Sequence, residues 1–252
     1  MIIILIKRFE SRIYRYDLQK VVSAEDGAII QPDHQSKSMF YVRYDSNFTI
    51  LSDEKTVVGV DYEGDSDVLI LENITKYIDS SYLPIRFGEH KRLIKTILYN
   101  KKINALLVGD TSGRVIQYDL GSSVTIRPKM VKDYGMFKIR SANSSANFGN
   151  LAVIGGEGQY LFIIINMKTR QVIAKSEISA IKDVSSINLC LINNNSQLAL
   201  TLSGKISEYT EQKTDIYDIT EVYCSSNDFS KNLSQNILLS KKKSLFLNFN
   251  DL

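Results

Sequence analysis

Short apolar runs, separated by polar turn residues, recur along the whole chain. The clearest series lies between residues 89 and 120, where runs at 93–99, 105–108 and 114–118 follow one another. The turns between these runs are made of Asn, Lys, Gly, Asp and Ser. Apolar runs of this length, rich in β-branched and aromatic residues, predict strands, and turns of this composition predict hairpins. The pattern therefore predicts an all-β fold.

The end of each predicted hairpin carries a common signature, Tyr-Asp-apolar or a variant of it. The acidic or amide residue of this signature lies at Asp17, Glu72, Asp119, Asn166, Asp218 and about Asn250. Gly156 follows Gly109 by 47 residues, and Asn166 follows Asp119 by the same interval, as an internal repeat requires. We therefore predict one domain over residues 1–252. It divides into a half-unit at 1–18 and repeats at about 36–73, 89–120, 137–167, 185–220 and 221–252.

The segment 89–120 resembles one WD40 repeat, the four-stranded blade of a β-propeller. In that family a His near the start of the blade, a Ser or Thr, a turn Asp and a Trp form a buried hydrogen-bonded chain. His90 matches the first of these positions, Ser112 stands at the turn-Asp position, and Tyr118 replaces the Trp. Asp119 matches the Asp of the Trp-Asp pair. The resemblance implies a WD40-like β-propeller of about five to six four-stranded blades.

The turn inside this segment also has a direct physical interpretation. Gly109 and Gly113 can adopt positive φ angles in a tight turn, and Asp110 and Ser112 can accept hydrogen bonds from neighbouring turn amides. The first unit, at 1–18, supplies only two strands, and the C-terminal end supplies no matching pair. Four explanations stay open: a missed hairpin, an open ring, completion by another chain, or a fragment of a longer protein.

Composition narrows the function classes. The chain has 252 residues, 44% of them hydrophobic, and a net charge of only +3, which predicts a sizeable core and gives no case for nucleic-acid binding. Cys190 and Cys224 have no metal-ligand spacing and are interpreted as buried or half-buried thiols in a reducing compartment. The apolar start, residues 1–6, is too short for a signal peptide and is interpreted as a strand, and no run is long enough to span a membrane.

Three groups of residues resemble functional sites but are interpreted as structural. His90 has no second ligand at metal-binding spacing and is interpreted as structural. The acidic cluster Asp61, Glu63, Asp65 and Asp67 lacks the spacing of a calcium loop and is interpreted as a solvated hairpin tip. The glycine-rich run 155–158 is interpreted as a strand-to-strand turn, because no helix or Gly-Lys-Ser/Thr follows it. We therefore expect no catalytic residue, no metal and no cofactor.

The functional prediction follows from the resemblance, since that family mostly supplies platforms for protein contacts. We predict a non-enzymatic scaffold inside a multi-subunit complex, in the cytoplasm, with a cytoskeletal or ciliary setting by association. The alternatives are a peptide-recognition adaptor of the ubiquitin-ligase type and a propeller enzyme. Candidate contacts for an adaptor are Arg86, His90, Lys91 and Arg92. Lys241, Lys242 and Lys243 are interpreted as a solvated turn or as contacts for an acidic partner.

Overall fold

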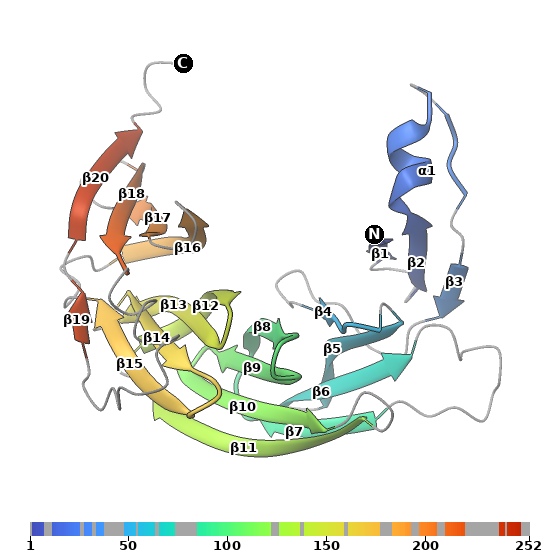
Figure 1. The fold of residues 1–252 in the computed structure, drawn as a ribbon, viewed down its shortest axis with the longest axis horizontal. Helices are drawn as coiled ribbons and strands as arrows, with labels where there is room; N and C mark the ends of the chain where they lie inside the picture. Colours follow the sequence, from blue (N-terminus) through green and yellow to red (C-terminus); the bar gives the residue numbers. More distant parts are fainter. Residues whose placement is uncertain are drawn as a thin grey trace. The chain divides into compact units, whose positions relative to one another are not determined.

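The computed structural model describes most of the chain and divides it into two compact units. The described residues are 2–7, 12–25, 28–31, 34–37, 48–53, 55–63, 66–73, 85–121, 126–136, 139–158, 161–176, 183–192, 197–205, 210–219, 237–239 and 241–247. The first unit is Met1–Leu93 and the second is Ile94–Leu252. Both are built of strands in predominantly antiparallel sheets, which confirms the predicted all-β fold (Figure 1).

The first unit holds two sheets. One contains β1 (Ile2–Lys7), β2 (Arg12–Asp17) and β3 (His34–Lys37), in that order. The other contains β4 (Thr49–Ile50), β5 (Thr56–Glu63), β6 (Ser66–Asn73) and β7 (Ile85–His90), also in chain order. Val57, Val58, Leu69 and Ile70 are buried in the two inner strands, β5 and β6. The β1–β2 hairpin was predicted, and β3 adds a third strand to it.

A short helix, α1 (Leu18–Ser23), follows β2 and was not predicted. Asp17 ends the strand and caps the helix, because its side-chain Oδ1 accepts a hydrogen bond from the Gln19 amide at 2.9 Å. Six residues are too few to show a helical period in the sequence. No helix in the described part of the chain is long and apolar enough to cross a membrane.

The second unit holds three sheets. The first contains β8 (Ile94–Asn100), β9 (Ala105–Asp110), β10 (Arg114–Gly121) and β11 (Ile126–Met136). The second contains β12 (Ile139–Phe148), β13 (Leu151–Gly158), β14 (Phe162–Asn166), β15 (Gln171–Ser176) and β19 (Ile237–Leu239). The third contains β16 (Asp183–Ile192), β17 (Gln197–Lys205), β18 (Thr210–Asp218) and β20 (Lys241–Leu247).

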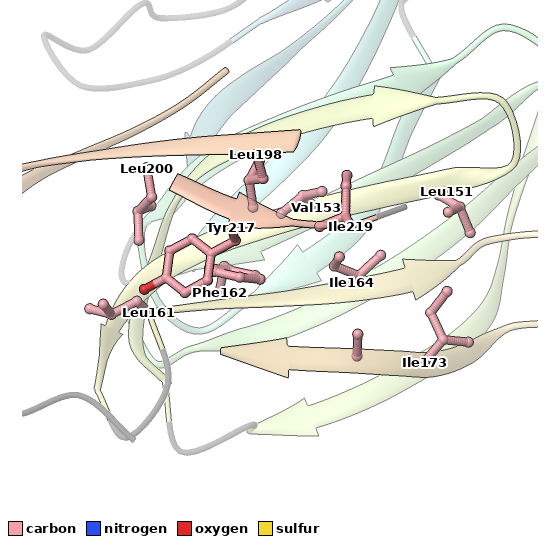
Figure 2. Packing of buried hydrophobic residues seen from close by; sticks show 11 residues of the cluster. Leu151, Val153, Leu161, Phe162, Ile164, Ile173, Leu198, Leu200, Tyr217 and Ile219 are labelled. Atoms are coloured by element: carbon pink, nitrogen blue, oxygen red, sulfur yellow. The ribbon is translucent and has the colours of Figure 1, made fainter. Parts of the chain in front are cut away.

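The middle sheet of this unit is buried on both faces. Alternate residues of β13 and β14 enter two different apolar clusters, because successive side chains of a strand point to opposite faces. Val153 and Ile164 pack with Leu198 of the β16–β18 sheet, and Phe162 meets Tyr217 edge-on at 4.8 Å between ring centroids (Figure 2). The other face packs against the β8–β11 sheet through a second set: Ala105, Leu107, Val115, Ala152, Ile154, Ile163, Ile165 and Met167. Burial on both faces explains why these strands are continuous apolar runs.

The predicted hairpin ends at Asp119, Asn166 and Asp218 are confirmed, but the strands that follow the first two of them were missed. Asp119, Asn166 and Asp218 lie in or at the end of β10, β14 and β18, the third strands of their sheets. The fourth strands of the first two sheets are β11 and β15, and β7 has the same place in the first unit. Residues 121–134 are mostly polar, so the sequence predicts a polar bridge there and no strand. Outer strands pack on one side only, so polar residues can occupy them.

The C-terminal hairpin prediction was wrong. The sequence predicts a hairpin of strands at 236–239 and 245–249, joined by a turn at Lys241, Lys242 and Lys243. Instead β19 pairs in parallel with β15, and β20 pairs antiparallel with β18 in a different sheet. Lys241, Lys242 and Lys243 therefore lie in strand β20, where Lys241 stands opposite Tyr217. The sixth predicted ending, near Asn250, and Cys224 lie outside the described residues.

The glycine-rich run is also a strand and not a turn. Residues 155–158 belong to β13, in which Gly155 pairs with Phe162 just as Gly109 pairs with Val115. Gly155, rather than Gly156, is therefore the structural counterpart of Gly109. The turn between β13 and β14 is one residue longer than the turn between β9 and β10. Residues of β14 therefore follow their counterparts in β10 by 47 positions, whereas residues of β13 follow theirs in β9 by one position fewer. Cys190 is exposed, which contradicts the predicted buried thiol.

Candidate functional site

The repeated Asp or Asn at the strand ends has a local structural role. The Asp119 side chain accepts a hydrogen bond from the Gly121 amide at 2.9 Å, and Asn166 accepts one from the Lys168 amide at 3.1 Å. Both are turns in which a short polar side chain replaces a backbone acceptor. The residue after each is buried, Leu120 in one hairpin and Met167 in the other. The repeated signature therefore marks a turn that is followed by a buried apolar residue.

Asp110 is the centre of the tight turn between β9 and β10. It is 2% exposed, and its Oδ1 accepts hydrogen bonds from the Ser112 amide (2.9 Å), the Ser112 hydroxyl and the Arg114 amide (3.2 Å). Gly113 has a φ of 79° and donates its amide to the Asp110 carbonyl. The sequence had placed Ser112 at the turn-Asp position. In the structure the turn carboxylate is that of Asp110, two residues earlier.

His90 and Asp67 are both buried in the first unit. The sequence analysis placed His90 among the candidate contact residues and Asp67 at a solvated hairpin tip. His90 ends β7 and is 0% exposed, and it stands opposite Asp67, which is 3% exposed, in the β6–β7 register. Asp67 was expected at a solvated tip, so that part of the prediction was wrong. The side chains of Asp61, Glu63 and Asp65 lie outside the description. Within the described residues no group of three His, Cys, Asp or Glu side chains could hold a metal ion.

Gln117 ties the β8–β11 sheet to the β12–β15 sheet. Its buried amide nitrogen donates to the Met167 carbonyl at 2.9 Å, and its amide oxygen accepts from the Tyr134 hydroxyl at 2.8 Å. Burial raises the pKa of Tyr134, and the positive charge of Arg170 offsets part of that rise. Asn100 adds a second link, because its amide nitrogen donates to the Gly149 carbonyl at 3.0 Å. These bonds fix the placement of the two sheets within the unit.

The predicted contact residues fall into separate places. Arg86 lies on β7, and Lys91 and Arg92 lie in the turn that follows it, all three with exposed side chains. We name these three residues the β7 patch. His90, predicted with them, is buried and is not part of that surface. Lys241, Lys242 and Lys243 lie on β20 in the second unit, and the structure describes only their backbone.

A second basic surface was missed by the sequence analysis. Lys129 and Lys132 are exposed on the outer strand β11, and Arg170 is exposed in the turn between β14 and β15. We name these three residues the β11 strip. The signal that could have found the strand is its mixture of charged and apolar residues, IRPKMVKDYGM, which the polar-bridge interpretation overlooked. The contribution of Arg170 comes from a segment far away in the sequence, which no local pattern reveals.

The fold matches solved β-propeller structures over nearly the whole chain. The β-propeller domain of Cps50 (Swd1) from Myceliophteria thermophila aligns with a TM-score of 0.55 and 10% identity, over 97% of this chain and 72% of that one. KlAtg21, solved in complex with the coiled coil of AgAtg16, aligns with a TM-score of 0.58 and 11% identity, over 98% and 68% of the two chains.

The fold is that of a β-propeller. No protein-family model matches the chain. The search of curated proteins also gave no match. At such low identity the likeness establishes the fold and leaves the activity to be argued from the residues.

Proposed function

We propose that this chain is a divergent WD40-type scaffold that holds other proteins together and catalyses no reaction. The proposal rests on the buried polar side chains, which form hydrogen bonds that hold turns and sheets in place. Asp110 fastens a turn, and Gln117 and Asn100 fasten one sheet to the next. Side chains committed to such bonds stabilise a rigid body, whereas the exposed charges lie on outer strands and turns. A rigid body with charged outer surfaces suits protein contacts.

The solved neighbours add support of a coarser kind. One of them, KlAtg21, was solved in complex with the coiled coil of another protein, which is a fact about that protein. By analogy of fold we propose that this chain also works in a complex with other proteins. A cytoplasmic complex of the cytoskeleton or cilium stays our working prediction for the setting, and imaging of the tagged chain in its own cell would test it.

The test of the scaffold proposal is stoichiometry. The tagged full chain would be isolated from its own cells under mild salt, and the mass of the isolated species would be measured by light scattering. We expect a stable species heavier than the 28.6 kDa chain, with a second protein in fixed ratio. A chain that elutes alone at every salt concentration would overturn the proposal.

The β7 patch keeps the adaptor function as a second candidate. Arg86, Lys91 and Arg92 are exposed together on one strand and the turn after it, as a peptide-binding surface requires. If the chain is an adaptor, reversal of these charges should release the isolated partner. If it is a scaffold that uses other surfaces, the partner ratio should stay the same after R86E, K91E and R92E together.

A further inference from the structure

The three cations of the β11 strip lie on related surfaces of two adjoining sheets. Lys129 stands opposite Asp119 and Lys132 stands opposite Gln117, so both lysines lie on the face that carries these two β10 residues. Gln117 bonds the Met167 carbonyl at the start of the turn that contains Arg170. The strip is thus built from β11 and from the neighbouring turn.

Packing brings Arg170 close to β11. Tyr134 of β11 and Val172, two residues after Arg170, pack against the same apolar cluster between the sheets. The influence of the Arg170 charge on the Tyr134 hydroxyl agrees with this placement. Arg170 has a φ of 60°, a left-handed conformation that residues other than glycine adopt rarely. The turn therefore holds a long cation in a conformation for which glycine or asparagine would be the easier choice.

The nearby acidic groups are engaged elsewhere. Asp133 is on the opposite face of β11 and accepts two hydrogen bonds from the Arg114 guanidinium. Asp119, on the face of the strip, accepts the Gly121 amide in its turn. Asp119 keeps its negative charge in this bond, so the three cations leave the strip and Asp119 together with a net positive charge. A surface of this kind attracts a partner of opposite charge.

We propose that the β11 strip binds an acidic, extended segment of a partner protein. β11 lies at the edge of its sheet in the part of the chain that is described (Figure 1). A segment laid along it would place carboxylates beside Lys129, Lys132 and Arg170. The neighbouring sheet shows that an outer edge in this unit can take such a segment, since β15 pairs with β19 from far along the chain.

A protein segment fits this surface better than a membrane. Binding to an anionic bilayer favours exposed apolar side chains among the cations. Met130, the exposed apolar side chain of β11, stands opposite Tyr118 and thus on the other face of the strand from Lys129. Pro128 and three register shifts interrupt the backbone of β11, so a partner must rely on charge more than on a long hydrogen-bond ladder. The inference deepens the scaffold proposal and rests on it.

The experiment measures binding of a fluorescein-labelled peptide of about ten residues, alternating Glu and Ser, to the full chain by anisotropy. The test variant carries K129E, K132E and R170E. The matched control carries K20E, K55E and K101E, at exposed lysines that belong to neither named surface, with the same change in charge. We expect the test variant to weaken binding at least about tenfold and the control less than about threefold. The measurement is made at about 50 mM salt, where exposed charges are less screened.

Four outcomes would overturn the inference. They are no binding by the unmodified chain, equal weakening by both variants, weakening by the control alone, and binding to phosphatidylserine vesicles but not to the peptide. The double variant K129E/K132E keeps the test valid if R170E disturbs the turn, and circular dichroism checks folding. If neither the triple nor the double strip variant binds the peptide more weakly than the control does, the strip proposal is refuted. If the chain still has a stoichiometric cellular partner, the scaffold proposal stands.

Discussion

The inner strands β13 and β14 and the outer strand β11 belong to the same unit but are specified in different ways. In β14 four consecutive residues, Phe162 to Ile165, are each 0% exposed, because sheets pack on both of its faces. In β11 exposed residues, among them Lys129 and Lys132, are mixed with half-buried apolar ones such as Val131. Apolar burial therefore defines the inner strands, whereas β11 depends on backbone pairing and a few polar bonds. The inner strands should carry the stability and the outer strand the recognition.

The largest effect is expected at Phe162. Phe162→Ala would remove a fully buried ring that meets Tyr217 between two sheets, and we expect a loss of about 3–5 kcal/mol of unfolding free energy. Chemical denaturation measures it. Met130→Ala, at a side chain 54% exposed on the outer strand, is the control and should change stability by less than about 0.5 kcal/mol. Similar losses at both positions would remove the distinction between inner and outer strands.

The next effect tests the first sheet of the unit. Leu107 and Ile116 are 0% and 1% exposed, and each change to Ala should cost about 2–5 kcal/mol by denaturant melts. A loss below about 1 kcal/mol at both sites would show that the β9–β10 hairpin is not held as described.

Gln117 should give an intermediate effect, since it is a polar residue on an inner strand that holds the outer one. Gln117→Leu would leave the buried Met167 carbonyl and the Tyr134 hydroxyl without their present partner, at about 1–3 kcal/mol. Tyr134→Phe, which removes only one of the two bonds, should cost less. If the two variants melted alike, the bond to Met167 would contribute nothing to the packing of the sheets.

Arg114→Ala should have the smallest effect at neutral pH. Its ion pair with Asp133 has side chains 36% and 34% exposed, and such pairs contribute about 0–1 kcal/mol. Thermal melts in low and high salt would measure it, and the small difference should shrink as salt rises. A loss of several kcal/mol that shrinks as salt rises would mean that β11 is anchored by this ion pair more than by Gln117.

A pH titration provides the last comparison. Burial raises the pKa of Tyr118 from 10.0 to about 12, so the folded chain keeps this phenol neutral at pH values where the unfolded chain ionises it. The resulting stability is present below pH 10 and is lost as pH rises from about 10 to 12. Tyr118→Phe should flatten the fall of melting temperature in that range. An identical slope in both proteins would contradict the burial of Tyr118.

The sequence predicts the inner strands better than the outer ones for a physical reason. β9, β10, β13 and β14 are apolar on both faces, and that leaves a strong local signal. β7, β11 and β15 carry many polar residues, and β19 pairs with a strand some sixty positions earlier, which no period reveals. The turn acid was assigned to Ser112 because the repeat was aligned by spacing, whereas burial and hydrogen bonds select Asp110.

The candidate site was predicted only in part, for the same reason. Arg86, Lys91 and Arg92 are exposed on a short continuous stretch, so a local inspection finds them, and their role stays a prediction. Lys132 and Arg170 are brought together by the packing of two sheets. Their proximity depends on strand register and on the Gln117 bond, which must be known before the surface can be seen.

The position of β19 has a consequence for the order of folding. One residue separates β19 from β20, and the two strands pair with different sheets. The edge of β18 is therefore completed by a segment whose neighbour is held on β15, so both sheets must exist before the C-terminal strands can dock. Contacts between segments so far apart in sequence close late, because loop closure costs entropy before the contacts form. Pulse-labelled hydrogen exchange should show β19 and β20 protected together, after β13 and β14.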